Sequence, residues 1–181
     1  LGSSSEAVGT FNNFATFQAE GGDMFVTECD NETGGEFELL ADTELTGNFN
    51  NIGGTFDDDG DFELEVIDGD FTNDTTMVLD AGGDINVSNA ANVFDNNGTL
   101  SVDGTGSVVT VAGEFQNDGG TIDLQDGATD DEFTITGNVT GTGTLSFDVD
   151  LTGAGSTDVL NVGSYNGTLS FGADVLASGD V

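Results

Sequence analysis

The chain has 181 residues, which is enough for one domain with a hydrophobic core, and its 35 Asp and Glu residues give a formal net charge of -35. It contains no Lys, Arg or His, so it has no side chain that could neutralise phosphate groups. Nucleic acids and anionic membrane surfaces are therefore excluded as partners. No stretch approaches the roughly 20 apolar residues of a membrane span, and membrane insertion is not expected.

After a short lead-in, residues 1–8, a Phe-x-Asn motif begins to recur. It occurs at residues 11–13, 49–51, 71–73, 94–96 and 115–117. Cys29 takes the Phe place before Asn31, and Val139 and Tyr165 continue the series in weakened form. The predicted coils thus start near residues 11, 29, 49, 71, 94, 115, 139 and 165, at intervals of 18 to 26 residues. Internal repeats of this length indicate a repeat architecture.

Each motif is followed by a strand pattern in which apolar and polar residues alternate. A threonine opens these runs at Thr16, Thr55, Thr76, Thr99, Thr121, Thr144 and Thr168. The clearest runs after threonine are residues 100–102, 122–124, 145–147 and 169–171. A loop then leads to a second run, as at residues 62–64, 85–87, 109–111, 133–135 and 160–162. Period-two alternation predicts strands with one buried face, and no segment shows a helical period.

A repeat of about 20 residues with two or three short strands cannot bury its apolar face alone, but stacked repeats can. We therefore predict an all-β fold, a β-solenoid in the form of a right-handed parallel β-helix of about eight coils. The solenoid is expected over residues 9–176 as one domain, followed by a tail at residues 177–181. The repeat length disfavours the left-handed type with a strict 18-residue period.

Two columns of equivalent residues are expected to run along the solenoid. The apolar column fills a corner of the interior and consists of Phe11, Cys29, Phe49, Phe71, Phe94, Phe115, Val139 and Tyr165. The asparagine column turns the chain, with each amide bonded to the asparagines above and below, and consists of Asn13, Asn31, Asn51, Asn73, Asn96 and Asn117. We expect glycine in these turns to permit the bend, and Cys29 to be a buried thiol.

Residues 94–171 carry a more specific repeat style, clearest in "GGTIDLQDGATDDEFTITGNVTGTGTLSFDVDL" and the following "STDVLNV". In this region the chain resembles the passenger region of bacterial autotransporters. The resemblance implies a right-handed β-helix, secreted to the cell surface and used in adhesion, aggregation and biofilm formation. It carries no catalytic signature, so it implies a fold and a location more than an activity.

Carboxylates provide the only candidate sites. In the sequence "DDDGD", Asp57, Asp59 and Asp61 could converge on Ca²⁺ from one loop, and a solvated acidic loop is the alternative. Residues 130–132, Asp-Asp-Glu, form a second candidate. Ca²⁺ is the only cofactor that the sequence suggests. Asp148 with Asp150, or Asp123 with neighbours on adjacent coils, could act as a glycosidase pair, although the chain lacks the basic side chains that β-helical polysaccharide enzymes use.

The expected function is that of a non-enzymatic, extracellular or cell-surface β-helix, either a stalk segment of an adhesin or a protomer of a filament or biofilm fibre. The alternative is a polysaccharide-binding or polysaccharide-degrading β-helix. Neither "LGSSSEAVG" nor "VLASGDV" can form an amphipathic cap. We therefore expect the end coils to be paired, by end-to-end self-association or by continuation of the chain, with the Phe and Asn columns in register across the junction. Surface glycans are a further expected partner.

Overall fold

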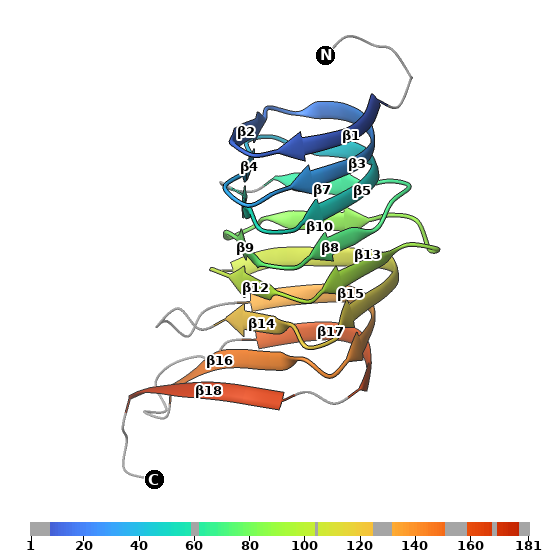
Figure 1. Ribbon diagram of the computed structural model, residues 1–181. Helices are drawn as coiled ribbons and strands as arrows, with labels where there is room; N and C mark the ends of the chain where they lie inside the picture. Colours follow the sequence, from blue (N-terminus) through green and yellow to red (C-terminus); the bar gives the residue numbers. More distant parts are fainter. Residues whose placement is uncertain are drawn as a thin grey trace.

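The computed structural model describes residues 8–58, 62–103, 105–124, 132–150, 159–167 and 170–177. These residues form a β-solenoid in which parallel strands of successive coils stack along one axis (Figure 1). The described part contains strands and turns and no helix. The predicted all-β solenoid is therefore confirmed. Residues 1–7 of the expected lead-in and residues 178–181 of the expected tail lie outside the described part.

Each coil contributes strands to two sheets. The 10-stranded sheet contains β1 (Val8–Asn13), β3 (Gly22–Asn31), β5 (Thr43–Asn51), β7 (Glu63–Val66), β8 (Phe71–Asn73), β10 (Asp84–Val87), β11 (Val93–Asn96), β13 (Thr105–Asn117), β15 (Glu132–Gly141) and β17 (Val159–Gly167). The 8-stranded sheet contains β2 (Thr16–Ala19), β4 (Glu36–Leu39), β6 (Thr55–Asp58), β9 (Thr76–Leu79), β12 (Thr99–Val102), β14 (Thr121–Leu124), β16 (Thr144–Asp150) and β18 (Ser170–Ala177). The first sheet bends within each coil: β5 pairs with β7 along one half and with β8 along the other.

The solenoid has about six turns, slightly fewer than the eight coils expected. Six repeats carry an asparagine at the turn between the two sheets, from Asn13 to Asn117. The last two repeats continue the strand pairing but have Gly141 and Gly167 at this position.

The interior is formed by the inward-facing residues of both sheets. Most short strands show the expected alternation of buried and half-buried residues, as in β7, β10, β12 and β14. The largest side chains that are fully buried are phenylalanines, including Phe37, Phe49 and Phe133. Burying one such side chain contributes about 1.5–3 kcal/mol to folding. Stacking the coils therefore supplies the core that one repeat cannot form alone.

The last strand is paired two residues away from the expected register. We expected Thr168 and Leu169 to align with the threonine and leucine of β16, but Ser170 pairs with Thr144 and Phe171 with Leu145. Thr168 and Leu169 themselves lie outside the described part. Because Val139 and Tyr165 are paired, a turn of equal length before each strand brings Ser170 opposite Thr144. Turn length, rather than the threonine, sets this register.

The turn glycines have two roles. Gly34 and Gly119, inside the turns, have a positive φ of 87° and 89°, as expected of glycines that permit the bend. Glycines at the end of these turns, such as Gly54 and Gly120, do not have a positive φ, so the bend does not require them. A Cβ on Gly54 would lie 2.5 Å from Asn31 Nδ2, and a Cβ on Gly120 would lie 2.7 Å from Asn117 Oδ1. Glycine is needed there because the asparagine amides pack directly against the backbone.

Candidate functional site

The asparagine column lies at the turn between the two sheets and is buried along its length. Each amide from Asn13 to Asn96 donates to Oδ1 of the asparagine in the next coil, at N···O distances of 2.8–3.1 Å. The same Nδ2 donates a second bond to a backbone carbonyl where the next coil enters the 8-stranded sheet, for example Asn73 to Thr99 O at 3.1 Å. Each rung thus ties both sheets of one coil to the next coil.

The apolar column runs beside the asparagines. Phe49, Phe71, Phe94 and Phe115 are fully buried, and consecutive rings stack with centroids 4.5–4.9 Å apart. Val139 continues the column, and Phe11 begins it in a half-buried position. Tyr165 pairs with Val139 through the backbone, and its side chain lies outside the described part.

Cys29 occupies the phenylalanine place between Phe11 and Phe49 and is fully buried. Burial raises the pKa of its thiol to about 12, and the neighbouring Asp30 carboxylate adds to the rise. The reactive thiolate is therefore scarce at neutral pH, and the residue behaves as an apolar core side chain.

The proposed calcium loop is only partly visible. Asp57 lies on β6 in a half-buried position, whereas Asp59 and Asp61 fall outside the described residues. Within the described ranges, no group of three or more Cys, Asp and Glu side chains is placed to hold a metal ion. The loop hypothesis therefore remains a prediction.

Asp58, the next residue, is the unexpected member of this acidic run. It points inward and is fully buried, and its register partners on the neighbouring coils are Leu39 and Leu79. A Cβ on Gly83 would overlap its carboxylate, so the glycine makes room for it. Strand alternation makes Asp58 inward because Phe56 is inward too, two residues earlier.

The other candidate carboxylates do not form a visible site. Asp130 and Asp131 lie outside the described part, and Glu132 is exposed and accepts a hydrogen bond from Asn161 Nδ2 at 3.1 Å. The side chains of Asp148 and Asp150 also lie outside it. Asp123 pairs through its backbone with Ser101 and Ser146, so no second carboxylate adjoins it in register.

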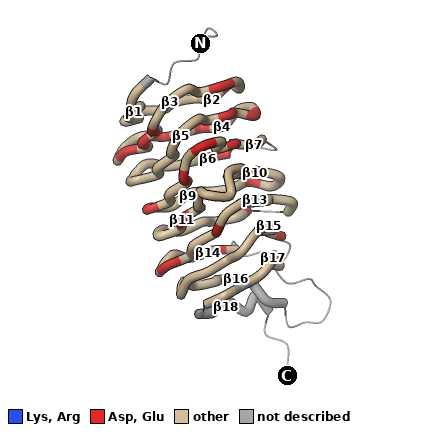
Figure 2. Tube along the Cα trace, turned by 90° about the vertical axis from the view of Figure 1, so that its right-hand side faces the viewer, with Lys and Arg blue, Asp and Glu red and all other residues tan. Residues whose placement is uncertain are grey.

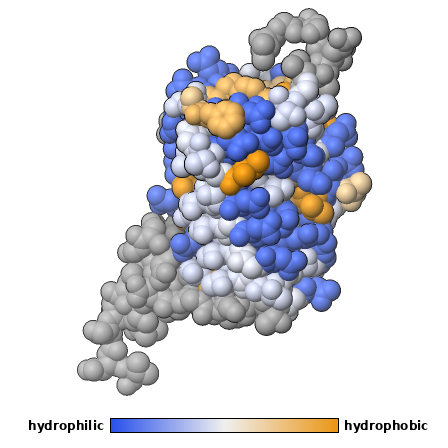
Figure 3. All heavy atoms as spheres, in the orientation of Figure 1, coloured by the Kyte–Doolittle hydropathy of each residue, from blue (hydrophilic) through white to orange (hydrophobic). Residues whose placement is uncertain are grey.

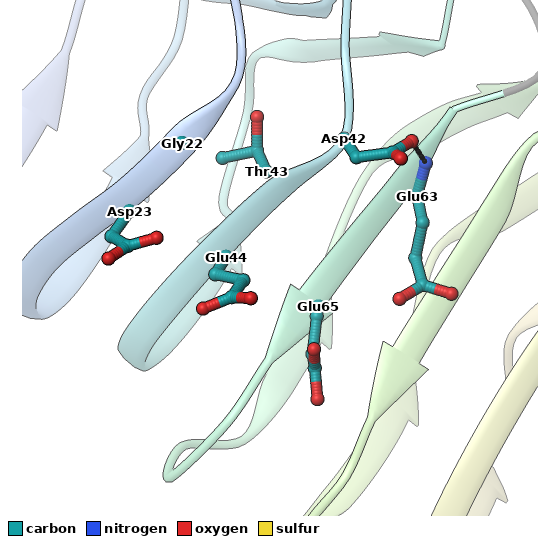
Figure 4. Close-up of a pocket in the computed structure, with 7 residues that line it drawn as sticks. All are labelled: Gly22, Asp23, Asp42, Thr43, Glu44, Glu63 and Glu65. Carbon is teal, nitrogen blue, oxygen red and sulfur yellow. Dashed lines mark hydrogen bonds between the residues drawn. The ribbon is translucent and has the colours of Figure 1, made fainter.

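The structure brings together a carboxylate group that the sequence reasoning missed. Asp23, Glu44 and Glu65 are direct register partners on β3, β5 and β7, and with Asp42 and Glu63 they line a shallow depression (Figure 4). The signal was present in the sequence, because the three residues of the row are 21 positions apart, which is one repeat. Period-two alternation then places all three on the outer face.

The surroundings of this depression raise the pKa of one carboxyl group, first through burial and then through nearby charges. Burial raises the pKa of Glu63 above its ordinary value of 4.5, and the carboxylates of Glu65, Asp84 and Asp42 add to the rise. A hydrogen bond with Asn86 opposes it. The Glu63 backbone N–H donates to Asp42 Oδ1 at 3.1 Å, which holds the two acidic residues close together.

Elsewhere, carboxylates are paired with amides and hydroxyls of adjacent coils. Asn50 Nδ2 donates to Glu28 and Asp30, Gln18 Nε2 donates to Glu38 at 2.7 Å, and further amides repeat the arrangement. Figure 2 shows acidic residues recurring along the rod with no Lys or Arg among them, and Figure 3 shows a mostly hydrophilic face with separate apolar spots. These bonds satisfy the oxygen atoms but leave the negative charge uncompensated.

No known family model, curated protein or solved structure shows significant similarity to the chain. Among the described residues, no helix is long and apolar enough to cross a membrane.

Proposed function

We propose that the chain is a structural, non-catalytic β-solenoid of the extracellular space or cell surface, serving as the stalk of an adhesin or as the protomer of a filament. The observation that carries this proposal is the interior shared by successive coils, in which asparagine rungs from Asn13 to Asn117 and stacked rings from Phe49 to Phe115 link one coil to the next. Each residue of such a rod contacts mainly the adjacent coils, so the rod can lengthen by adding coils without a new core. The resemblance of residues 94–171 to autotransporter passengers supports the same location and role.

End-to-end association is part of this proposal. Among the described strands, β1 and β2 at one end and β17 and β18 at the other are paired on one side only. The rings of Phe11 and Phe17 are half-buried near the first edge, and Val159 and Val162 are 40% and 38% exposed near the second. Exposed strand edges with apolar neighbours favour pairing with another chain. The asparagine column does not reach the second edge, which corrects the expectation that it guides this junction.

Light scattering and electron microscopy of the purified chain, at low and high salt, test the proposal. Head-to-tail contacts that do not close give filaments, and screening of the acidic repulsion should lengthen them. A chain that stays monomeric at high salt would contradict the filament form.

Polysaccharide activity is the competing function, and the acidic depression is where it would be centred. Binding to a panel of neutral and basic polysaccharides, together with a reducing-end assay for hydrolysis, separates the two functions. Hydrolysis that is lost in Glu44→Gln would replace the structural proposal.

A further inference from the structure

The two ladders that tie the coils together end at the same place. Asn117 accepts a hydrogen bond from Asn96 at 2.8 Å, but its register partner in the next coil is Gly141, which has no side chain. The following coil has Gly167 there. The stack of phenylalanine rings ends in the same coil, at Phe115, where Val139 follows.

The break leaves a buried polar group without its partner. Asn117 is fully buried, and its Nδ2 has no hydrogen-bond partner among the described residues. In the five preceding rungs this atom donates twice, to an asparagine and to a backbone carbonyl. The junction after Asn117 therefore lacks both bonds and contains an unsatisfied donor, which disfavours the closed state.

Backbone pairing still crosses the break. β13 pairs with β15 on both sides of a register irregularity between Thr110 and Glu114, and β14 pairs with β16 without interruption. Among the described residues, the contacts across the break are strand and turn hydrogen bonds, apolar contacts and an exposed side-chain bond from Asn138 Nδ2 to Glu114 at 3.3 Å, and they include no buried amide rung. In a solenoid, stability is set junction by junction, so a weak junction divides the rod into units that open separately.

We propose that β15 to β18 open as one unit at the Asn117–Gly141 junction while the coils that carry the asparagine ladder stay closed. Opening uncovers the edges of β13 and β14, including the amide of Asn117. This inference does not depend on the proposed function, because it concerns only the order in which the coils separate.

Hydrogen exchange of the intact chain, measured by mass spectrometry across a series of low urea concentrations, tests the proposal. Amides of β15–β18 should exchange at least about ten-fold faster than those of β9–β12, with one shared urea dependence smaller than that of global unfolding. Uniform protection, or a gradual decline from β12 to β18 without a step at the junction, would overturn it.

A pair of matched variants gives a second test. Asn117→Ala removes an amide that makes no bond across the junction and whose unsatisfied donor disfavours the closed state, so the exchange of β15–β18 should stay the same or become slower. Asn73→Ala, an identical substitution at an equally buried rung, should accelerate exchange in the coils on both of its sides. If Asn117→Ala accelerates exchange in β15–β18 about ten-fold, the amide does support the later coils and the proposal is wrong.

Discussion

Replacing Phe71 tests the packed column directly, because its ring lies between two others. The ring is fully buried, with centroids 4.9 Å from Phe49 and 4.5 Å from Phe94, and it meets Phe56 edge-on at 6.2 Å. Truncating a buried phenylalanine to alanine costs about 3–5 kcal/mol, and each lost ring pair removes about 0.5–1.5 kcal/mol beyond the area term. Since the terms overlap, we expect Phe71→Ala to lower the free energy of unfolding by about 4–5 kcal/mol.

Urea unfolding followed by far-ultraviolet circular dichroism at fixed salt measures this loss. Phe14→Ala is the matched control, since Phe14 is 65% exposed and the same change there should cost under about 0.5 kcal/mol. Phe71→Asp would also bury a charge without a counter-charge and should unfold several coils at 25 °C. The reasoning is refuted if Phe71→Ala costs less than about 1 kcal/mol with an unchanged urea dependence.

Four further outcomes are expected. The free energy of unfolding should fall as the pH rises from about 4.5, because the fold raises the pKa of Glu63 and is destabilised when this carboxyl group ionises. Glu63→Gln should flatten this dependence in a pH series of urea titrations. The melting temperature at pH 7 should rise with NaCl, and a flat response would contradict the role of charge repulsion. A larger rise with Ca²⁺ than with NaCl of matched ionic strength would indicate a specific site that includes Asp57. Cys29 should resist iodoacetamide at pH 8 in the folded state and react fully in urea, and equal rates would show that the thiol is accessible. Asp58→Leu should raise the free energy of unfolding by about 1 kcal/mol or more, with Asp57→Leu as the control. A lower free energy of unfolding would mean that the interactions of the buried carboxylate outweigh its desolvation.

The repeated columns could be inferred from the sequence because a solenoid places equivalent residues of consecutive repeats one above another. The spacing of Phe71 and Phe94, with Asn73 and Asn96 two residues later, suffices to align both columns. The row of Asp23, Glu44 and Glu65 could have been found in the same way. Its members are 21 positions apart, so local runs of acidic residues do not reveal it.

Features that depend on exact fit between coils required the tertiary structure. The two-residue difference at Ser170 depends on turn length, and threonine composition alone gives the wrong register. A glycine before a strand, such as Gly120, is needed because a Cβ there would lie too close to an asparagine amide. Its backbone φ does not require glycine, so local backbone preference does not reveal this. The orphaned amide of Asn117 likewise becomes evident only when Gly141 is placed opposite it.

Alternation and repetition along the chain predict the class of fold, the period of the coil and the residues of the two interior columns. The three-dimensional arrangement of the coils fixes where the hydrogen-bonded column ends and how Gly83 makes room for the buried carboxylate of Asp58. It also shows that carboxylates from separate coils share one face. The physical reason is that hydrogen bonds, close contacts and charge repulsion act over a few ångströms between coils, and those distances are fixed only when turn lengths and strand registers are set together.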